Sequence, residues 1–258
     1  MKSDLTVLMR QANLDALLIT GPARNNPAMT YFTGSIHVGQ ADLLVPREGE
    51  PVLVFHNPME REEAQKAGLR TKNGREYKPM QLLKQTGGDA LKAIAMRYQK
   101  MFREFNISGN VALYGKVEAG PVLTIIRELE ELLPDVRFIG ESSLDSTLIK
   151  ARTTKDESEI EQIRAIGAVT IEVVGRTADL LKTSPVHNGV LLDADREPLT
   201  VKKVKNRINL WLAELGAENP HGTIFAPGRD GGIPHSTGAP DEPIRTGIPI
   251  VFDIYPCQ

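Results

Sequence analysis

The sequence has 258 residues, of which 41% are hydrophobic and 25% are charged, a balance typical of folded globular proteins. Its formal net charge of −2 shows no basic excess, so we expect no nucleic-acid partner. The single cysteine, Cys257, excludes an internal disulfide framework and fits a reducing compartment. No apolar run reaches the roughly 20 residues of a membrane span, and residues 1–16 lack the pattern of a signal peptide. We therefore expect a cytoplasmic protein without membrane contacts.

Residues 1–150 alternate between short apolar runs and amphipathic stretches. Residues 41–46 and 51–55 are strand-length apolar runs separated by a short polar loop that contains glycine, which predicts a hairpin. In chain order, the predicted elements are a helix at 5–13, strands at 15–20, 41–46 and 51–55, helices at 58–67 and 88–105, a strand at 111–114, a helix at 118–133 and a strand at 136–139. Strands divided by helices of this length predict an α/β fold with a partly parallel sheet.

A domain boundary is predicted near 148–156, where charged residues and threonine interrupt the apolar pattern and divide the chain into residues 1–150 and 151–258. Thr154 and Glu157 have the spacing of a capping box, which predicts that a long helix begins there. In chain order, the second part is predicted to hold this helix to about Lys182, a helix at 199–215, a strand at 222–226, a loop at 227–234 and a strand at 248–254.

The last predicted strand is almost wholly apolar, the pattern of a strand buried on both faces. Asp253 lies within it, where an unpaired carboxylate would be costly to remove from water. Two interpretations stay open: the carboxylate bonds a backbone amide or an arginine, or it binds a metal ion, because hard cations prefer carboxylates on rigid strands. Only five residues follow Asp253, and a central strand usually has further chain to pair its edge, so we expect that the sequence stops within a domain.

His235 lies in the loop 231–236, which contains two glycines and Pro234. Proline restricts the residue before it, and together these residues suggest a backbone shaped to aim the imidazole. An ordinary exposed histidine is the alternative interpretation. Three further histidines show no metal-ligand spacing and are interpreted as surface or packing residues: His37, His56 and His187.

Several stretches resemble the pita-bread metallopeptidase family, which includes Xaa-Pro aminopeptidases, prolidases and creatinases. Residues 26–34 (NPAMTYFTG) resemble the family's N-terminal motif, and residues 148–165 resemble the linker and first helix of its catalytic domain. Residues 224–228, Pro234 with His235, and residues 247–253 resemble the approach to its metal site. The resemblance implies a creatinase-like N-terminal α/β domain at 1–150, followed by the first part of a pita-bread α+β catalytic domain at 151–258.

The function that this resemblance implies is hydrolysis of a peptide bond next to proline, by water that divalent Mn, Co or Zn activates. His235 matches the histidine that contacts the substrate and stabilises the tetrahedral intermediate, and Asp253 matches the first of five metal ligands. The other four, an Asp, a His and two Glu, would follow Asp253. We therefore expect a chain truncated after the first metal-ligand position, inactive alone and binding no metal. The resemblance also implies a proline-containing peptide substrate and a homodimer.

Two other functions stay open. Creatinase-like members of the family cleave a non-peptide C–N bond, and a non-catalytic relative would act as a binding or dimerisation module. The coding sequence beyond codon 258 discriminates among these, because metal ligands encoded there favour the peptidase and substitutions of those ligands favour the module.

Overall fold

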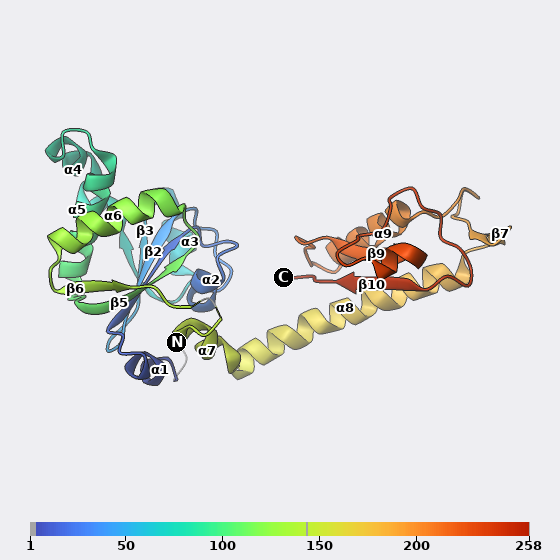
Figure 1. Ribbon diagram of the computed structural model, residues 1–258, viewed down its shortest axis with the longest axis horizontal. Helices are drawn as coiled ribbons and strands as arrows, with labels where there is room; N and C mark the ends of the chain where they lie inside the picture. Colours follow the sequence, from blue (N-terminus) through green and yellow to red (C-terminus); the bar gives the residue numbers. More distant parts are fainter. Residues whose placement is uncertain (1–3, 143, 258) are drawn as a thin grey trace. The chain divides into compact units, whose positions relative to one another are not determined.

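The computed structural model describes residues 4–142 and 144–257. The chain divides into two compact units, a first unit of residues 1–154 and a second unit of residues 155–258. Each unit has a hydrophobic core of its own, and Figure 1 shows the helices and strands of both.

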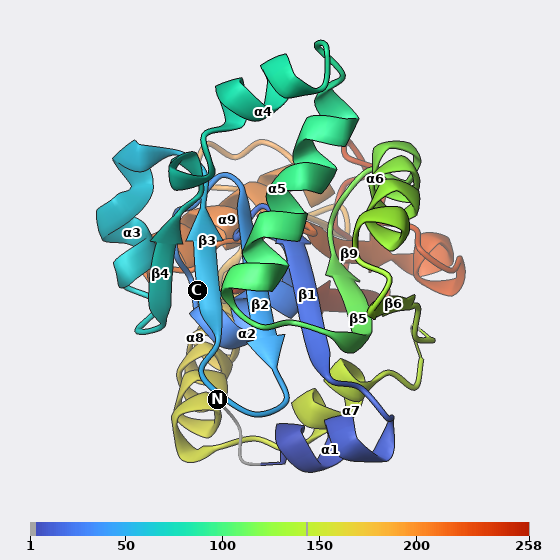
Figure 2. The ribbon, with the colours of Figure 1, turned by 90° about the vertical axis from the view of Figure 1, so that its left-hand side faces the viewer.

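The first unit is built on a six-stranded sheet in the order β4-β3-β2-β1-β5-β6 (Figure 2). Its strands are β1 (Ala16–Gly21), β2 (Ala41–Pro46), β3 (Val52–Phe55), β4 (Arg70–Asn73), β5 (Gly109–Gly115) and β6 (Val136–Ile139). β2 runs antiparallel to β1 and β3, and the other neighbouring pairs are parallel. The predicted hairpin and the predicted α/β fold class are therefore confirmed.

Helices cover both faces of this sheet. The helical segments of the first unit are α1 (Leu5–Gln11), α2 (Pro27–Thr33), η1 (Pro58–Glu60), α3 (Arg61–Gln65), η2 (Gly74–Tyr77), α4 (Pro79–Gln85), α5 (Ala90–Glu104), α6 (Ala119–Leu132) and α7 (Thr147–Thr153). Helices α1, α2, α3 and α7 contribute to the core on one face, and α5 and α6 to the core on the other, the face seen in Figure 2. Because both faces are covered, strands β1 and β3 are buried along their whole length, as continuous apolar runs require.

The second unit packs two helices against two short antiparallel strand pairs. Its elements are α8 (Glu157–Thr183), β7 (Val186–His187), β8 (Val190–Leu191), α9 (Val201–Glu214), β9 (Thr223–Pro227), η3 (Gly228–Gly232) and β10 (Ile250–Ile254). β9 pairs with β10 and β7 with β8. One side of α9 is fully buried in the core of this unit, and α8 contributes Val173 to the same core.

The capping box of α8 lies two residues later than the sequence spacing predicts. The side chain of Asp156 accepts the backbone N–H of Glu159 at 3.0 Å, and the Glu159 carboxylate accepts the backbone N–H of Asp156 at 2.9 Å. Thr154 instead donates its hydroxyl to Oδ2 of Asp4 at 2.7 Å and follows the last residue of α7. Aspartate caps at least as well as threonine, and only the fold decides where the preceding helix ends.

The prediction that the last strand is buried on both faces is wrong. Three side chains of β10 pack against the core of the second unit: Ile250, Phe252 and Ile254. Since side chains alternate along a strand, Val251 and Asp253 face the other way, and Val251 is 46% exposed. The helices of this unit cover one side of the β9–β10 pair, so the apolar run does not indicate two-sided burial.

Among the described helices, none combines the length and apolar character that crossing a lipid bilayer demands.

Candidate functional site

Asp253 is the next-to-last residue of β10 and lies opposite Ile224 of β9. It is partly exposed, and the Tyr255 hydroxyl donates a hydrogen bond of 2.5 Å to its Oδ2 atom. The Asp253 carboxylate raises the pKa of Tyr255 through this bond, so the phenol keeps its proton. A partly exposed carboxylate bears little of the desolvation cost that the apolar sequence around Asp253 suggests.

The segment that carries His235 is fastened to the edge of β9. Phe225 of β9 donates its backbone N–H to the carbonyl of Thr237 at 3.4 Å, and the Lys205 ammonium group donates to the same carbonyl at 3.0 Å. Burial lowers the pKa of Lys205. Gly238 follows with a φ of +83°, and a Cβ built there would lie 2.2 Å from the Phe225 carbonyl oxygen. Only glycine permits so close an approach of two backbones.

His235 has a φ of 63°, the left-handed conformation that a non-glycine residue adopts at a cost of about 1 kcal/mol or more. The turn around it is closed by a hydrogen bond from the Ser236 N–H to the Ile233 carbonyl, and the Asp230 carboxylate accepts the Ala239 N–H at 3.1 Å. The imidazole is exposed and makes no hydrogen bond with the residues that the structure describes. The loop therefore holds the backbone of His235 while leaving its side chain available.

A complete metal site is not assembled by the described part of the chain. Within residues 4–142 and 144–257, no group of three or more His, Cys, Asp or Glu side chains could hold a metal ion. Asp253 supplies one carboxylate, and one of its oxygens is occupied by Tyr255. Since a bound divalent ion generally needs several protein ligands, these residues do not fit the dinuclear site that the resemblance implies.

In the first unit, the N-terminal motif fastens α2 to the end of β1. Asn26 is buried, and its side-chain oxygen accepts the Met29 N–H, which caps α2. Its side-chain amide donates to the Thr20 carbonyl at 3.3 Å. The backbone of β5 also lies close to Thr20. A Cβ added to Gly115, the last residue of β5, would lie 1.9 Å from the Thr20 carbonyl oxygen.

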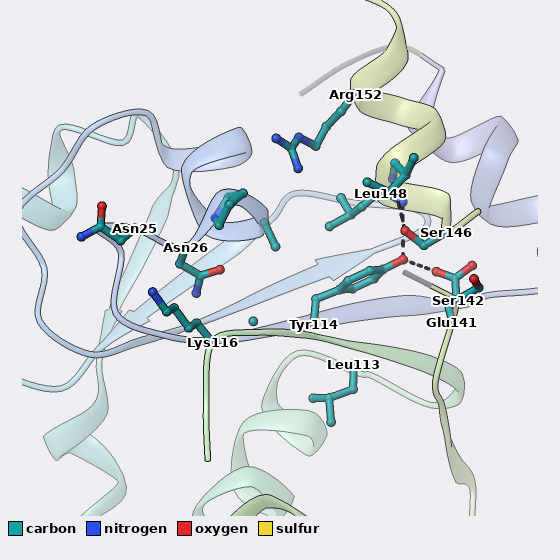
Figure 3. A pocket seen from close by; sticks show the side chains of 14 residues that line it. Asn25, Asn26, Leu113, Tyr114, Lys116, Glu141, Ser142, Ser146, Leu148 and Arg152 are labelled. Carbon is teal, nitrogen blue, oxygen red and sulfur yellow. Dashed lines mark hydrogen bonds between the residues drawn. The ribbon is translucent and has the colours of Figure 1, made fainter. Parts of the chain in front are cut away.

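Beside these strand ends lies an open hollow of about 590 Å³ (Figure 3). It is lined by residues 25–28, by residues 113–116 and by side chains from the segment 141–152. Tyr114 donates its hydroxyl to the Glu141 carboxylate, which also accepts the Thr147 hydroxyl at 2.8 Å. Burial raises the pKa of Tyr114, and the bond to Glu141 raises it further, so this phenol stays a donor.

The sequence prediction missed this hollow. Lys116 and Arg152 line it from segments that lie 36 residues apart, so no local pattern joins them. One available signal is the position of Lys116 directly after a strand, because the carboxyl ends of parallel strands are where open α/β sheets bind ligands.

Residues 3–144 match the model of the Creatinase/Prolidase N-terminal domain family, which is more than half of the chain. The chain therefore belongs to this family, and the predicted resemblance is confirmed. No curated protein matches the sequence.

Solved structures with the same fold extend the likeness to both units. The X-Pro aminopeptidase of Thermotoga maritima is 20% identical with a TM-score of 0.62, and the match covers 97% of this chain and 59% of that one. The prolidase of Pyrococcus furiosus is 17% identical with a TM-score of 0.65, covering 98% and 65%. The N-terminal domain of the FACT complex subunit SPT16 from chickpea (Cicer arietinum) is 9% identical with a TM-score of 0.50, covering 93% and 58%.

At these identities the likeness shows the fold alone. The chain spans about two thirds or less of the length of each of these structures. By family and fold, the protein is related to the X-Pro peptidases.

Proposed function

We propose that this protein acts in the hydrolysis of peptide bonds next to proline, as an Xaa-Pro peptidase-type metallohydrolase. Its family and its likeness to X-Pro aminopeptidase and prolidase structures support the proposal. The observation that carries it is the left-handed backbone of His235 in a loop fastened to β9. Strain of this kind persists where the surrounding structure enforces it, and it concentrates at functional sites.

In this proposal, the imidazole of His235 donates a hydrogen bond to the carbonyl oxygen of the substrate. Because the backbone of His235 is already fixed, little ordering is needed when the substrate arrives. Asp253 is one carboxylate of the site for the divalent ion, Mn, Co or Zn, that the family implies. The described residues offer no full ligand set, so the chemistry proposed for this chain stops at substrate binding by His235.

A titration followed through the histidine Cε1–H resonances tests the substrate class. We expect the tripeptide Ala-Pro-Ala to shift the resonance of His235 saturably, and Ala-Ala-Ala to leave it in place. The variant His235→Asn assigns that resonance, and His187, on the β7–β8 pair, serves as the unaffected control. Equal shifts with both tripeptides, or no shift with either, would contradict the proposal.

Calorimetric titration with Mn²⁺ tests the metal prediction. One carboxylate cannot anchor an ion, so we expect no binding tighter than on the order of millimolar. Micromolar binding with a defined stoichiometry would contradict this expectation.

A non-catalytic binding or dimerisation module is the second candidate. It is supported by the fold likeness to the SPT16 domain. Self-association in sedimentation experiments, together with a His235 resonance that is indifferent to both tripeptides, would favour the module. Creatine, added as a third probe, tests the creatinase-like alternative. The predicted homodimer and the cytoplasmic location stay predictions.

A further inference from the structure

The loop of residues 233–239, which carries His235, is tied at both ends to a single residue, Asp230. At the start of the loop, the Ile233 N–H donates to the backbone carbonyl of Asp230 at 3.1 Å. At the end of the loop, the Ala239 N–H donates to the carboxylate oxygen Oδ2 of Asp230, also at 3.1 Å. One residue of η3 therefore closes the whole loop.

Inside this loop, His235 has a backbone conformation that the surrounding chain must hold. The Ser236 N–H bonds to the Ile233 carbonyl, so residues 233–236 form a β-turn with Pro234 second and His235 third. With proline second and a φ of 63° third, the turn is of type II, whose third position is normally taken by glycine. A residue with a Cβ is strained there, and such strain persists only where the surrounding structure enforces it.

The other contacts hold the far end of the loop less firmly than Asp230 does. The Phe225 N–H reaches the Thr237 carbonyl at 3.4 Å, which is longer than the roughly 2.7 to 3.2 Å that is usual for such bonds. The Lys205 ammonium group donates to the same carbonyl at 3.0 Å, but from a long side chain whose ordering costs rotamer freedom. The Asp230 side chain is short, and its bond from Ala239 is strengthened by the negative charge of the carboxylate.

The segment around Asp230 also connects the loop to the strand that carries Asp253. A Cβ added to Gly231, the next residue of η3, would lie 2.9 Å from the Ala226 carbonyl oxygen and 3.1 Å from Cγ2 of Val251. The backbone of η3 therefore packs directly against the β9–β10 pair. Val251 and Asp253 face the same side of β10, because side chains alternate along a strand. Through η3, the loop is thus joined to the face of β10 that carries this carboxylate.

The geometry points to Asp230 as a positioning residue of the site: its carbonyl and its carboxylate hold the two ends of the loop, so that the imidazole of His235 is fixed before a peptide arrives. In this role Asp230 touches no atom of the peptide and acts only through His235. Ordering a loop during binding costs free energy, so a loop that is already ordered binds its ligand more tightly. The inference rests on the proposed role of His235 in peptide binding, whereas the state of the loop is measured without any peptide.

The variants Asp230→Ala and Asp230→Asn are the matched pair that tests this role in the free protein. Alanine removes the acceptor, and asparagine keeps an acceptor oxygen. In Asp230→Ala, we expect hydrogen exchange of the Ala239 amide to speed about tenfold, the loss of one charge-assisted bond. We also expect a weaker NOE between the amide and α protons of His235, a signal that a positive φ makes strong. Asp230→Asn should restore most of both signals, and Asp241→Ala, which removes an exposed acid of the following segment, should change neither.

The second measurement is the affinity for Ala-Pro-Ala, followed through the Cε1–H resonance of His235. Asp230→Ala is expected to bind this tripeptide about tenfold more weakly than the unchanged protein, and Asp230→Asn nearly as tightly. Asp230→Leu, which has the shape of the asparagine variant without its acceptor, takes the place of Asp230→Ala if Trp211 fluorescence shows that the alanine variant does not fold.

The inference is overturned if the variant without an acceptor keeps the slow exchange of Ala239 and the His235 NOE, or if it binds Ala-Pro-Ala as tightly as the unchanged protein. It is also overturned if Asp241→Ala has the same effects as Asp230→Ala. Failure of the proposed function gives a different result, in which no protein binds Ala-Pro-Ala while the two loop signals still separate Asp230→Ala from Asp230→Asn.

Discussion

The Nε2 atom of His56 lies 2.7 Å from Oδ2 of Asp42, a residue that is only 1% exposed. Asp42 also accepts hydrogen bonds from the hydroxyls of Tyr98 at 2.6 Å and Thr20 at 2.7 Å, and Arg97 lies 3.4 Å away. Burial by itself would raise the pKa of Asp42, but the His56 hydrogen bond and the Arg97 charge outweigh it and lower the pKa to about 2. This network ties β1, β2 and α5 together at the core of the first unit.

Acid should weaken the first unit through Asp42. A carboxyl with a pKa of about 2 in the folded state and about 3.9 in the unfolded state stabilises the fold at neutral pH by about 2 to 3 kcal/mol. This contribution is complete above the unfolded pKa and is lost as the pH falls from about 4 toward 2. Asp42→Asn should therefore lower the unfolding free energy of the first unit at pH 7 by about that amount. The unfolding free energy of the variant should also fall less steeply as the pH is lowered from about 4 toward 2.

The stability of the first unit is measured as a function of pH by urea unfolding, with hydrogen exchange of the amides of β2 and α5 as the probe. Trp211, the single tryptophan, belongs to the second unit, so its fluorescence transition serves as the internal control and should not move. A variant whose stability falls with acid as steeply as that of the unchanged protein would contradict the role of Asp42.

Gly238→Ala should destabilise the second unit by roughly 2 kcal/mol or more, because it adds a methyl group 2.2 Å from the Phe225 carbonyl at a φ of +83°. Gly175→Ala is the matched control. It lies in α8 with no atom within 4 Å of the added Cβ, and should gain about 0.5 to 1 kcal/mol from helix propensity. Both changes are measured by urea unfolding with Trp211 fluorescence. Equal effects of the two would mean that the loop is not pressed against β9.

His235→Gly should leave the second unit as stable as before or raise its unfolding free energy by up to about 1 kcal/mol, because glycine adopts a φ of 63° without strain. His221→Gly, at a residue without a positive φ, should instead be neutral or lose about 0.5 to 1 kcal/mol. Losses of the same size at both positions would argue against stored strain at His235.

Asp156→Ala should speed hydrogen exchange in the first turn of α8 about fivefold, since an N-cap is worth about 1 kcal/mol. Glu157→Ala removes only an exposed ion pair of 3.7 Å with Arg164, and its effect should stay within about 0.5 kcal/mol. Mass spectrometry of the peptides that cover residues 157–163 resolves the difference. A larger increase in exchange for Glu157→Ala than for Asp156→Ala would instead support the capping box predicted at Thr154 and Glu157.

The longer elements were predictable because their signals are local. The helical period of residues 88–105 anticipates α5, and the paired apolar runs anticipate the β2–β3 hairpin to within a residue. Shorter elements carry no such signal. β4 (Arg70–Asn73) is polar and becomes a strand through its pairing with β3, and α2 is held by the cap from Asn26 to Met29.

The sequence by itself determined the family, through the order of its motifs, and the alternation of strands and helices that makes the sheet. Tertiary structure decided what each chemical group faces. Asp253 shares the apolar pattern of a buried strand, yet the helices cover one side of the β9–β10 pair and leave this carboxylate partly exposed. Asp42, in an equally apolar run, is the carboxylate that is buried. Periodicity records which residues share a face. Burial, and the lining of one hollow by Lys116 and Arg152, depend on which distant segments the topology brings together.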